Sequence, residues 1–127
     1  MFEGIDHVGI AVAELDGALA TYTGTLGMEV VHRERVPEQG VELAMLGAGV
    51  ELLAPLAPDT PVGRFLAARG PGLHHVAYRV ADIESALAQL RERSVELIDE
   101  TPREGAGSSR IAFLRPLGGV LTELVER

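Results

Sequence analysis

The sequence predicts an α+β fold made of two repeated βαβββ modules whose sheets pair around a cleft. Three observations predict it. Two strand-like fragments share the pattern His-Val-(Gly/Ala)-x-x-Val when they are aligned on His7 and His75. The same order of strand, helix and strand patterns follows each fragment. A glutamate then recurs towards the end of each copy, at Glu51 and at Glu123.

The first module is expected to span about residues 1–56. Its first strand alternates, with Val8, Ile10 and Val12 on one face and His7, Gly9 and Ala11 on the other. Apolar residues at helical spacing predict a helix over 14–26, with Asp16 as its N-cap and Gly27 as its stop. Three further strands are expected over 28–36, 41–46 and 50–56.

The second module is expected to span about residues 72–127 of the same single domain. A strand over 74–80, a helix over 82–94 capped by Asp82, and strands over 95–100, 110–116 and 118–127 repeat the first order. A glycine-rich loop is expected over 101–109. A linker over about 57–71, bounded by proline and glycine, has a middle that suits one short helix.

The repeats also predict a cavity. Each module alone would leave one face of its sheet exposed, so two packed copies form the stable object. Small residues beside the two repeated histidines, namely Gly9, Ala11 and Ala77, suit a face that lines a cavity better than one that fills a core.

Four side chains at equivalent places in the repeats, those of His7, Glu51, His75 and Glu123, are candidate metal ligands. Two neutral imidazoles and two carboxylates suit a divalent ion such as Co, Mn, Ni, Fe or Zn. An octahedral ion would keep two positions for water or a chelating substrate. Strand alternation turns His74 to the opposite face, and His32, in a charged run, is expected to be solvated.

Composition excludes several other classes of function. The formal net charge of −8 argues against nucleic acid or an anionic membrane as a partner. The absence of cysteine excludes disulfides, thiolate metal sites and a cysteine nucleophile. No signal peptide and no membrane-spanning run are recognised, so a cytoplasmic location is expected.

The stretch ELLAPLAPDTPVGRFLAARGPGLHH, together with IDHVGIAV and GGVLTELV, resembles the methylmalonyl-CoA epimerase family of the vicinal oxygen chelate superfamily. The resemblance implies paired, incompletely closed sheets around a cleft that holds one divalent ion on His7, Glu51, His75 and Glu123. It also implies a homodimer that interconverts (2R)- and (2S)-methylmalonyl-CoA, an acyl-CoA thioester, through α-proton abstraction and a metal-stabilised enolate.

Epimerisation requires a base on each face of the α-carbon, and Glu123 is one candidate. Some family members place a second catalytic glutamate one residue beyond Glu42, where this chain has Leu43. Glu42 is the other candidate base if a bulge turns it inward, but a regular strand, which we favour, turns it away from the cleft. Ser108 and Ser109 are candidate contacts for the substrate.

Two alternatives remain open from the sequence. A glyoxalase I-type lyase or another metalloenzyme of this superfamily would use the same four ligands. A non-enzymatic protein that sequesters a ligand on the same scaffold would not need them, so their presence argues against it.

Overall fold

The computed structural model describes all 127 residues and divides into two compact units. The first unit comprises Met1–His7 and His75–Arg127, and the second comprises Val8–His74. Strand β1 (Phe2–Ala11) therefore begins in the first unit and ends in the second. The division follows directly after one repeated histidine and directly before the other.

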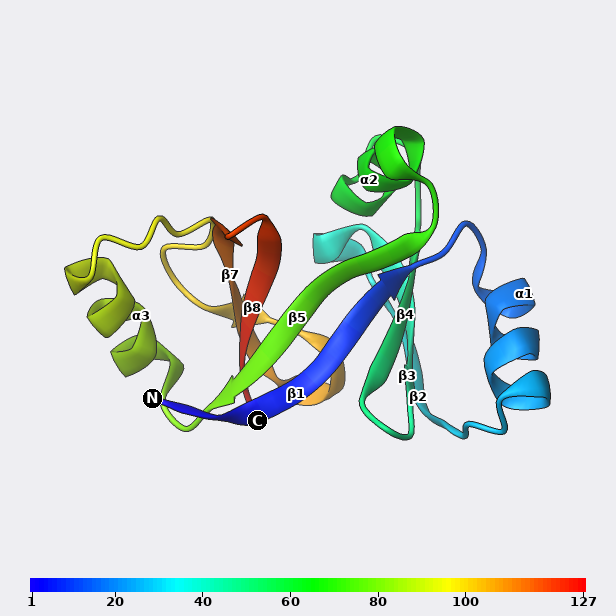
Figure 1. Ribbon diagram of the computed structural model, residues 1–127, viewed down its shortest axis with the longest axis horizontal. Coiled ribbons are helices and arrows are strands. Elements are labelled where there is room, and N and C mark those ends of the chain that lie inside the picture. Colours follow the sequence, from blue (N-terminus) through cyan, green and yellow to red (C-terminus); the bar gives the residue numbers. More distant parts are fainter. The chain divides into compact units, whose positions relative to one another are not determined.

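The second unit contains a mixed sheet in the order β2–β3–β4–β1. Strands β2 (Val30–Val36), β3 (Val41–Leu46) and β4 (Val50–Pro55) are antiparallel neighbours, and the end of β1 runs parallel to β4. Helix α1 (Leu15–Leu19) packs on β3 and β4, and α2 (Pro61–Arg69) contacts β4 (Figure 1). The short helix expected in the linker is thus confirmed as α2.

The residues packed under α1 identify the face of β1 that contacts the hydrophobic core. The buried cluster there consists of Leu15, Ala44, Leu46, Leu52 and Ala54, and Ile10 and Val12 pack against it. Gly9 and Ala11, also buried, lie on the opposite face of β1 because successive side chains of a strand alternate. The alternation predicted for this strand is confirmed.

The predicted N-cap of α1 is wrong by two residues. Glu14 has an extended backbone, and its side chain folds back to accept a hydrogen bond of 2.6 Å from the amide of Gly17. Asp16 lies in the first turn instead and accepts from Arg33. The helix continues as a π-helical segment, η1 (Ala20–Thr25), and Gly27, with φ of +72°, ends it as expected.

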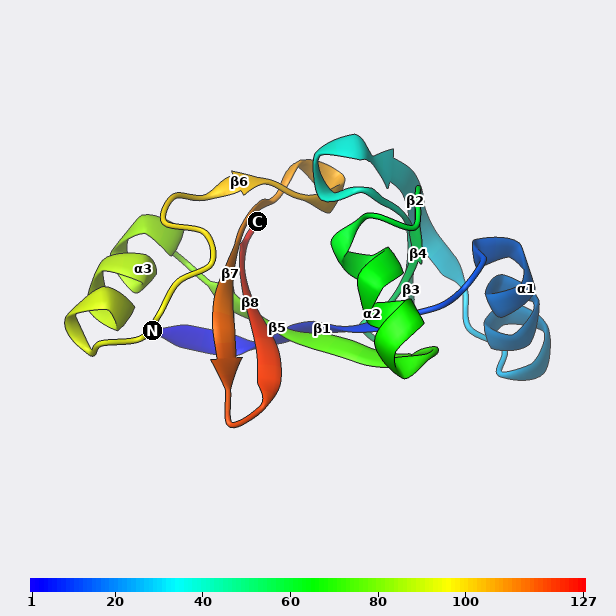
Figure 2. The same cartoon turned by 90° about the horizontal axis from the view of Figure 1, so that it is seen from above.

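The first unit contains strands in the order β1–β5–β8–β7–β6. Strand β5 (Gly72–Val80) runs parallel to β8 (Val120–Glu126), and β7 (Arg110–Leu117) is antiparallel to β8. Helix α3 (Ile83–Glu92) covers one face of β7 and β8 (Figure 2). Its predicted cap is confirmed, because Asp82 accepts a hydrogen bond of 3.0 Å from the amide of Ser85.

The strand expected over 95–100 does not form. Only Leu97 makes an isolated bridge, to Leu114. The amides of Ile98 and Asp99 both donate to the carbonyl of Phe113, while the Asp99 carboxylate accepts from the Phe113 amide, and this pattern replaces a regular ladder. The second strand of this module is β6 (Arg103–Glu104), which lies inside the expected loop, and the loop continues as a 3₁₀ turn, η3 (Ala106–Ser108).

The order of elements confirms the α+β class and the two βαβββ modules: β1, α1, β2, β3 and β4, then β5, α3, β6, β7 and β8, with α2 between them. No helix has the length and hydrophobicity that a membrane-spanning segment requires.

Candidate metal centre

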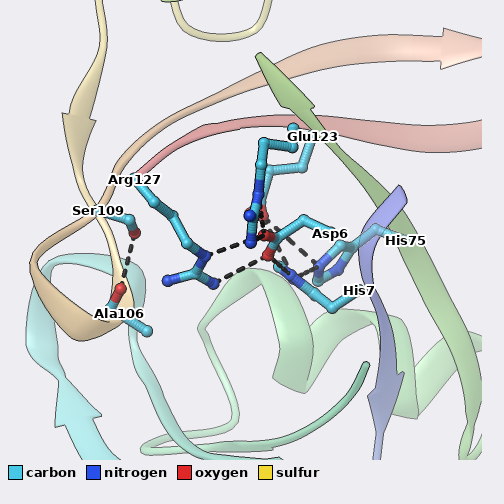
Figure 3. A network of polar contacts seen from close by, with 8 residues as sticks. Asp6, His7, His75, Ala106, Ser109, Glu123 and Arg127 are labelled. Carbon is cyan, nitrogen blue, oxygen red and sulfur yellow. Dashed lines mark hydrogen bonds and ion pairs between the residues drawn. The ribbon is translucent and has the colours of Figure 1, made fainter. Parts of the chain in front are cut away.

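Three potential metal ligands meet inside the first unit. His7 of β1, His75 of β5 and Glu123 of β8 are all buried, with exposed fractions of 3%, 2% and 5%. The two Nε2 atoms lie 3.2 Å apart, and Glu123 Oε1 lies 3.4 Å from His7 Nε2 and 4.0 Å from His75 Nε2 (Figure 3). Three segments far apart in the sequence thus bring two imidazole nitrogens and a carboxylate oxygen close together.

The pairing of β5 with β8 brings His75 and Glu123 to the same face. Ala77 is the register partner of Glu123, and His75 stands two residues before Ala77, so the alternation of β5 places its ring beside the carboxylate. Ala77 is fully buried and leaves room there. The ring of Phe113, on the other side of Glu123 in the sheet, packs edge-on against His75 at 5.5 Å.

The spacing of these donor atoms fits one divalent cation. Two ligand atoms about 2.1 Å from an ion lie roughly 3.0 Å apart at a right angle and about 3.4 Å apart at a tetrahedral angle. The separations of 3.2 and 3.4 Å fall in this range, and the third, 4.0 Å, corresponds to a wider angle. Two imidazoles and a carboxylate are a donor set that borderline divalent metals accept.

Glu51, the fourth predicted ligand, lies in the second unit on β4 and is 5% exposed. Its register partner is Gly9, and His7 stands two residues before Gly9 on the continuous strand β1. The pairing of Gly9 with Glu51 repeats the pairing of Ala77 with Glu123. In both repeats a small residue faces the glutamate, and the histidine precedes that small residue by two positions.

His74 belongs to the second unit and faces the ring of Phe65, whose centroid lies 4.9 Å away in an edge-on contact. Burial lowers the pKa of His74, and the charge of Glu51 partly opposes this effect. His74 is therefore a packed, neutral imidazole. His32, predicted to be solvated, is exposed, and its Nε2 lies 2.6 Å from Glu34 Oε1.

Glu42 does not share a face of the sheet with Glu51. The β3–β4 register has no bulge, and Leu43 pairs with Leu53, which lies on the same face of β4 as Glu51. The regular strand that we favoured is confirmed. Glu42 therefore takes the opposite face, where its carboxylate accepts a hydrogen bond of 2.9 Å from Arg33. This placement argues against Glu42 as the second base and leaves Leu43 on the face of Glu51.

The two candidate substrate contacts have different surroundings. Ser109 is buried, and its hydroxyl donates to the carbonyl of Ala106 at 2.7 Å. Ser108 is exposed and adopts a positive φ of 61° at the end of η3. Ser108 is thus the more accessible of the two to a ligand.

Sequence reasoning missed Asp6. Its side chain is 2% exposed, and its carboxylate lies 2.7 Å from His7 Nδ1 and accepts hydrogen bonds from Arg79 and Arg127 (Figure 3). Burial alone would raise the pKa of Asp6, but the hydrogen bonds from Arg127, His7 and Arg79 hold it well below its usual range. The only sequence signal was an aspartate directly before a candidate ligand.

Comparison with known proteins places this geometry in a family. The model of the Glyoxalase/Bleomycin resistance protein/Dioxygenase superfamily matches residues 6–113. Residues 1–127 are also similar along nearly their whole length to enzymes named as epimerases. The chain belongs to this superfamily and, within it, to the methylmalonyl-CoA epimerase family.

Three family members illustrate the likeness. The ethylmalonyl-CoA/methylmalonyl-CoA epimerase of Cereibacter sphaeroides is 36% identical, over 98% of each chain. The crystal structure of methylmalonyl-CoA epimerase from Mycobacterium tuberculosis is 45% identical, with a TM-score of 0.94 over 98% of this chain and 88% of that one. A methylmalonyl-CoA epimerase in complex with methylmalonyl-CoA and NH4+ is 42% identical, with a TM-score of 0.95 over 99% and 95%.

Proposed function

We propose that this protein interconverts (2R)- and (2S)-methylmalonyl-CoA by removing and returning the α-proton. The observation that carries the proposal is the buried group of His7, His75 and Glu123 in a chain that matches epimerases over nearly its full length. The carboxylate of Glu123 is a proton acceptor. The spacing of the nitrogen and oxygen atoms in this group suits a cation, beside which negative charge can develop on the substrate.

We propose that Glu51 joins these three residues to hold one divalent ion, taken from Co, Mn, Ni, Fe and Zn. The equivalent registers of Glu51 with Gly9 and of Glu123 with Ala77 support this ligand set. When bound, such an ion supplies a Lewis acid that stabilises charge on the thioester oxygen as the α-proton leaves. His7 and His75, as neutral ligands, leave most of that positive charge available.

Glu123 is the proposed base on one face of the α-carbon. Its carboxylate, buried among imidazoles, would remove the α-proton on its own face, and the proton delivered to the opposite face would come from the second base. The second face lacks a glutamate at Leu43, and Glu42 is engaged by Arg33. We therefore propose that Glu51, the matching carboxylate of the other repeat, moves the second proton.

The loop around η3 is the proposed contact for the substrate. Ser108 is exposed and offers a hydroxyl, whereas the hydroxyl of Ser109 donates a hydrogen bond to the carbonyl of Ala106. We propose that Ser108 and the neighbouring amides bind the polar acyl group, and that Ser109 sets the shape of the turn.

Proton exchange in deuterated water tests the function. Methylmalonyl-CoA incubated with metal-loaded protein should gain α-deuterium and lose its stereochemical purity, and a chelator should abolish both effects until metal is restored. Mass spectrometry and a chiral assay of the thioester follow them. Absence of exchange by metal-loaded protein, combined with turnover of a glutathione hemithioacetal, would overturn the proposal in favour of a lyase.

The homodimer and the cytoplasmic location remain proposals. The resemblance to the epimerase family supports the dimer, and light scattering at micromolar concentration tests it against a monomer mass of 13.5 kDa. Cell fractionation tests the location.

A further inference from the structure

A buried carboxylate stands directly behind His7, on the side of the ring away from His75 and Glu123. Asp6 Oδ2 lies 2.7 Å from His7 Nδ1, while His7 Nε2 faces the other two ligand-type residues. In Figure 3 the Asp6 carboxylate lies between the His7 ring and the guanidinium of Arg127. Asp6 therefore contacts the part of the imidazole that a metal at Nε2 would leave free.

Both oxygens of Asp6 are occupied by donors. Arg127 donates to each of them, from Nε to Oδ1 at 2.9 Å and from Nη2 to Oδ2 at 2.8 Å. Arg79 donates to Oδ1 from Nη2 at 2.8 Å and from Nε at 3.2 Å. Guanidinium groups have no acceptor atoms, so these contacts require an ionised carboxylate that only accepts.

The donor pattern determines the tautomer of His7. Since Asp6 can only accept, the hydrogen bond of 2.7 Å requires a proton on His7 Nδ1. In the neutral ring the lone pair must then be on Nε2, which is the atom that faces His75 and Glu123. A ring with its proton on Nε2 could not bind a metal through that atom.

We propose that Asp6, held by Arg127 and Arg79, is a positioning residue that keeps His7 in the Nδ1–H tautomer with Nε2 ready to bind the metal. The inference rests on the proposed function, because it deepens the account of the same metal site. Carboxylates that accept a hydrogen bond from a ligating imidazole orient the ring and raise its basicity, and their loss costs about 10- to 100-fold in metal affinity.

The two arginines that bind Asp6 come from different segments of the first unit. Arg79 belongs to β5, and Arg127 follows the end of β8, so the carboxylate of β1 is tied to both neighbouring segments of the first unit. A Cβ added at Gly107 would lie 3.6 Å from Arg127 Nη1, which places this guanidinium beside the loop proposed to bind substrate. Asp6 and Arg127 together therefore connect the candidate ligand His7 with that loop.

Replacing Asp6 with asparagine should reverse the tautomer. An amide has one oxygen, which the donor-only arginines retain, and its NH2 group then points to His7 Nδ1. That nitrogen becomes the acceptor, and the proton moves to Nε2. The same logic explains why an aspartate-to-asparagine change behind a catalytic histidine holds the ring in the wrong tautomer.

The experiment compares wild type, Asp6→Asn and the matched control Asp16→Asn, whose carboxylate is an exposed partner of Arg33. Long-range proton–nitrogen NMR at pH 8 on metal-free protein reads the tautomer of His7. Competition with a chromogenic chelator measures the dissociation constants of Zn2+ and Co2+. Thermal unfolding checks that each variant folds.

Wild type and Asp16→Asn should show Nδ1–H at His7. Asp6→Asn should show Nε2–H and bind both ions about 10- to 100-fold more weakly. An Nε2–H ring in wild type would overturn the inference without any variant, as would an affinity within twofold of wild type in folded Asp6→Asn. If wild type binds neither ion but has the Nδ1–H ring, the metal-dependent function fails while the tautomer assignment stands.

Discussion

Two carboxylates are candidate bases, Glu123 and Glu42, and their surroundings differ so much that the same amide substitution should affect them very differently. Glu123 is buried with its Oε1 3.4 Å from His7 Nε2. Glu42 accepts a hydrogen bond from Arg33 on the face of β3 opposite to Leu43. Changing each to glutamine removes the charge and the basicity while keeping the size.

The expected magnitudes differ by orders of magnitude. Loss of a positioned general base costs about 100- to 10,000-fold in rate, or about 3–5.5 kcal/mol of barrier, so Glu123→Gln should fall in that range. The Glu42 and Arg33 side chains are 30% and 41% exposed, and such pairs contribute about 0–1 kcal/mol of stability. Glu42→Gln should therefore keep its rate within about tenfold of wild type, a barrier change below about 1.4 kcal/mol.

The assay is the initial rate of α-deuterium uptake by methylmalonyl-CoA at saturating metal, with metal content and melting temperature measured on the same samples. Glu123→Gln should retain part of its metal, since an amide oxygen can still bind. A 100-fold defect in Glu42→Gln with unchanged metal and melting temperature would refute the assignment of faces. A rate above about a tenth of wild type in Glu123→Gln would refute its role as base.

Three further predictions test the metal, the core and the pH dependence. His75→Ala should lose most of the bound ion, as measured by elemental analysis, and full retention would remove His75 from the ligand set. Leu52→Ala should lower the free energy of unfolding by about 2–5 kcal/mol in urea, because Leu52 is fully buried under α1. Burial lowers the pKa of His74 below 6.5, so its contribution to stability is complete above that pH and is lost as pH falls. His74→Gln should therefore lose less stability than wild type between pH 8 and pH 5.5, and an equal loss would contradict this account.

The repeated pattern predicted the faces of the strand residues because strand alternation is a local property. A histidine two residues before a small residue faces the same side as that small residue, whatever the rest of the chain does. The structure adds the register, in which the small residue is opposite a glutamate in both parallel pairs. The same regularity decided the face of Glu42, because no bulge interrupts the β3–β4 pairing.

Local signals failed where a side chain took a hydrogen-bonding role that the sequence pattern assigned to another group. Asp16 is the better N-cap by preference, but Glu14 reaches the amide of Gly17, where an added Cβ would lie 2.5 Å from its Oε1. The alternation over 95–100 predicted a strand, but the side chain of Asp99 takes the Phe113 amide that a ladder would use. Neither outcome can be read from the spacing of apolar residues.

The contact between Asp6 and Arg127 lay beyond sequence reasoning for a different reason: 121 positions separate the two residues. It also breaks the symmetry of the repeats. The residue before His7 is an ionised aspartate, whereas the residue before His75 is His74, an imidazole that burial keeps neutral against Phe65. An ionised neighbour raises the basicity of a ligating imidazole, and a neutral one adds no charge. The basicity of His7 therefore depends on Asp6, whose place in the second repeat is taken by an imidazole.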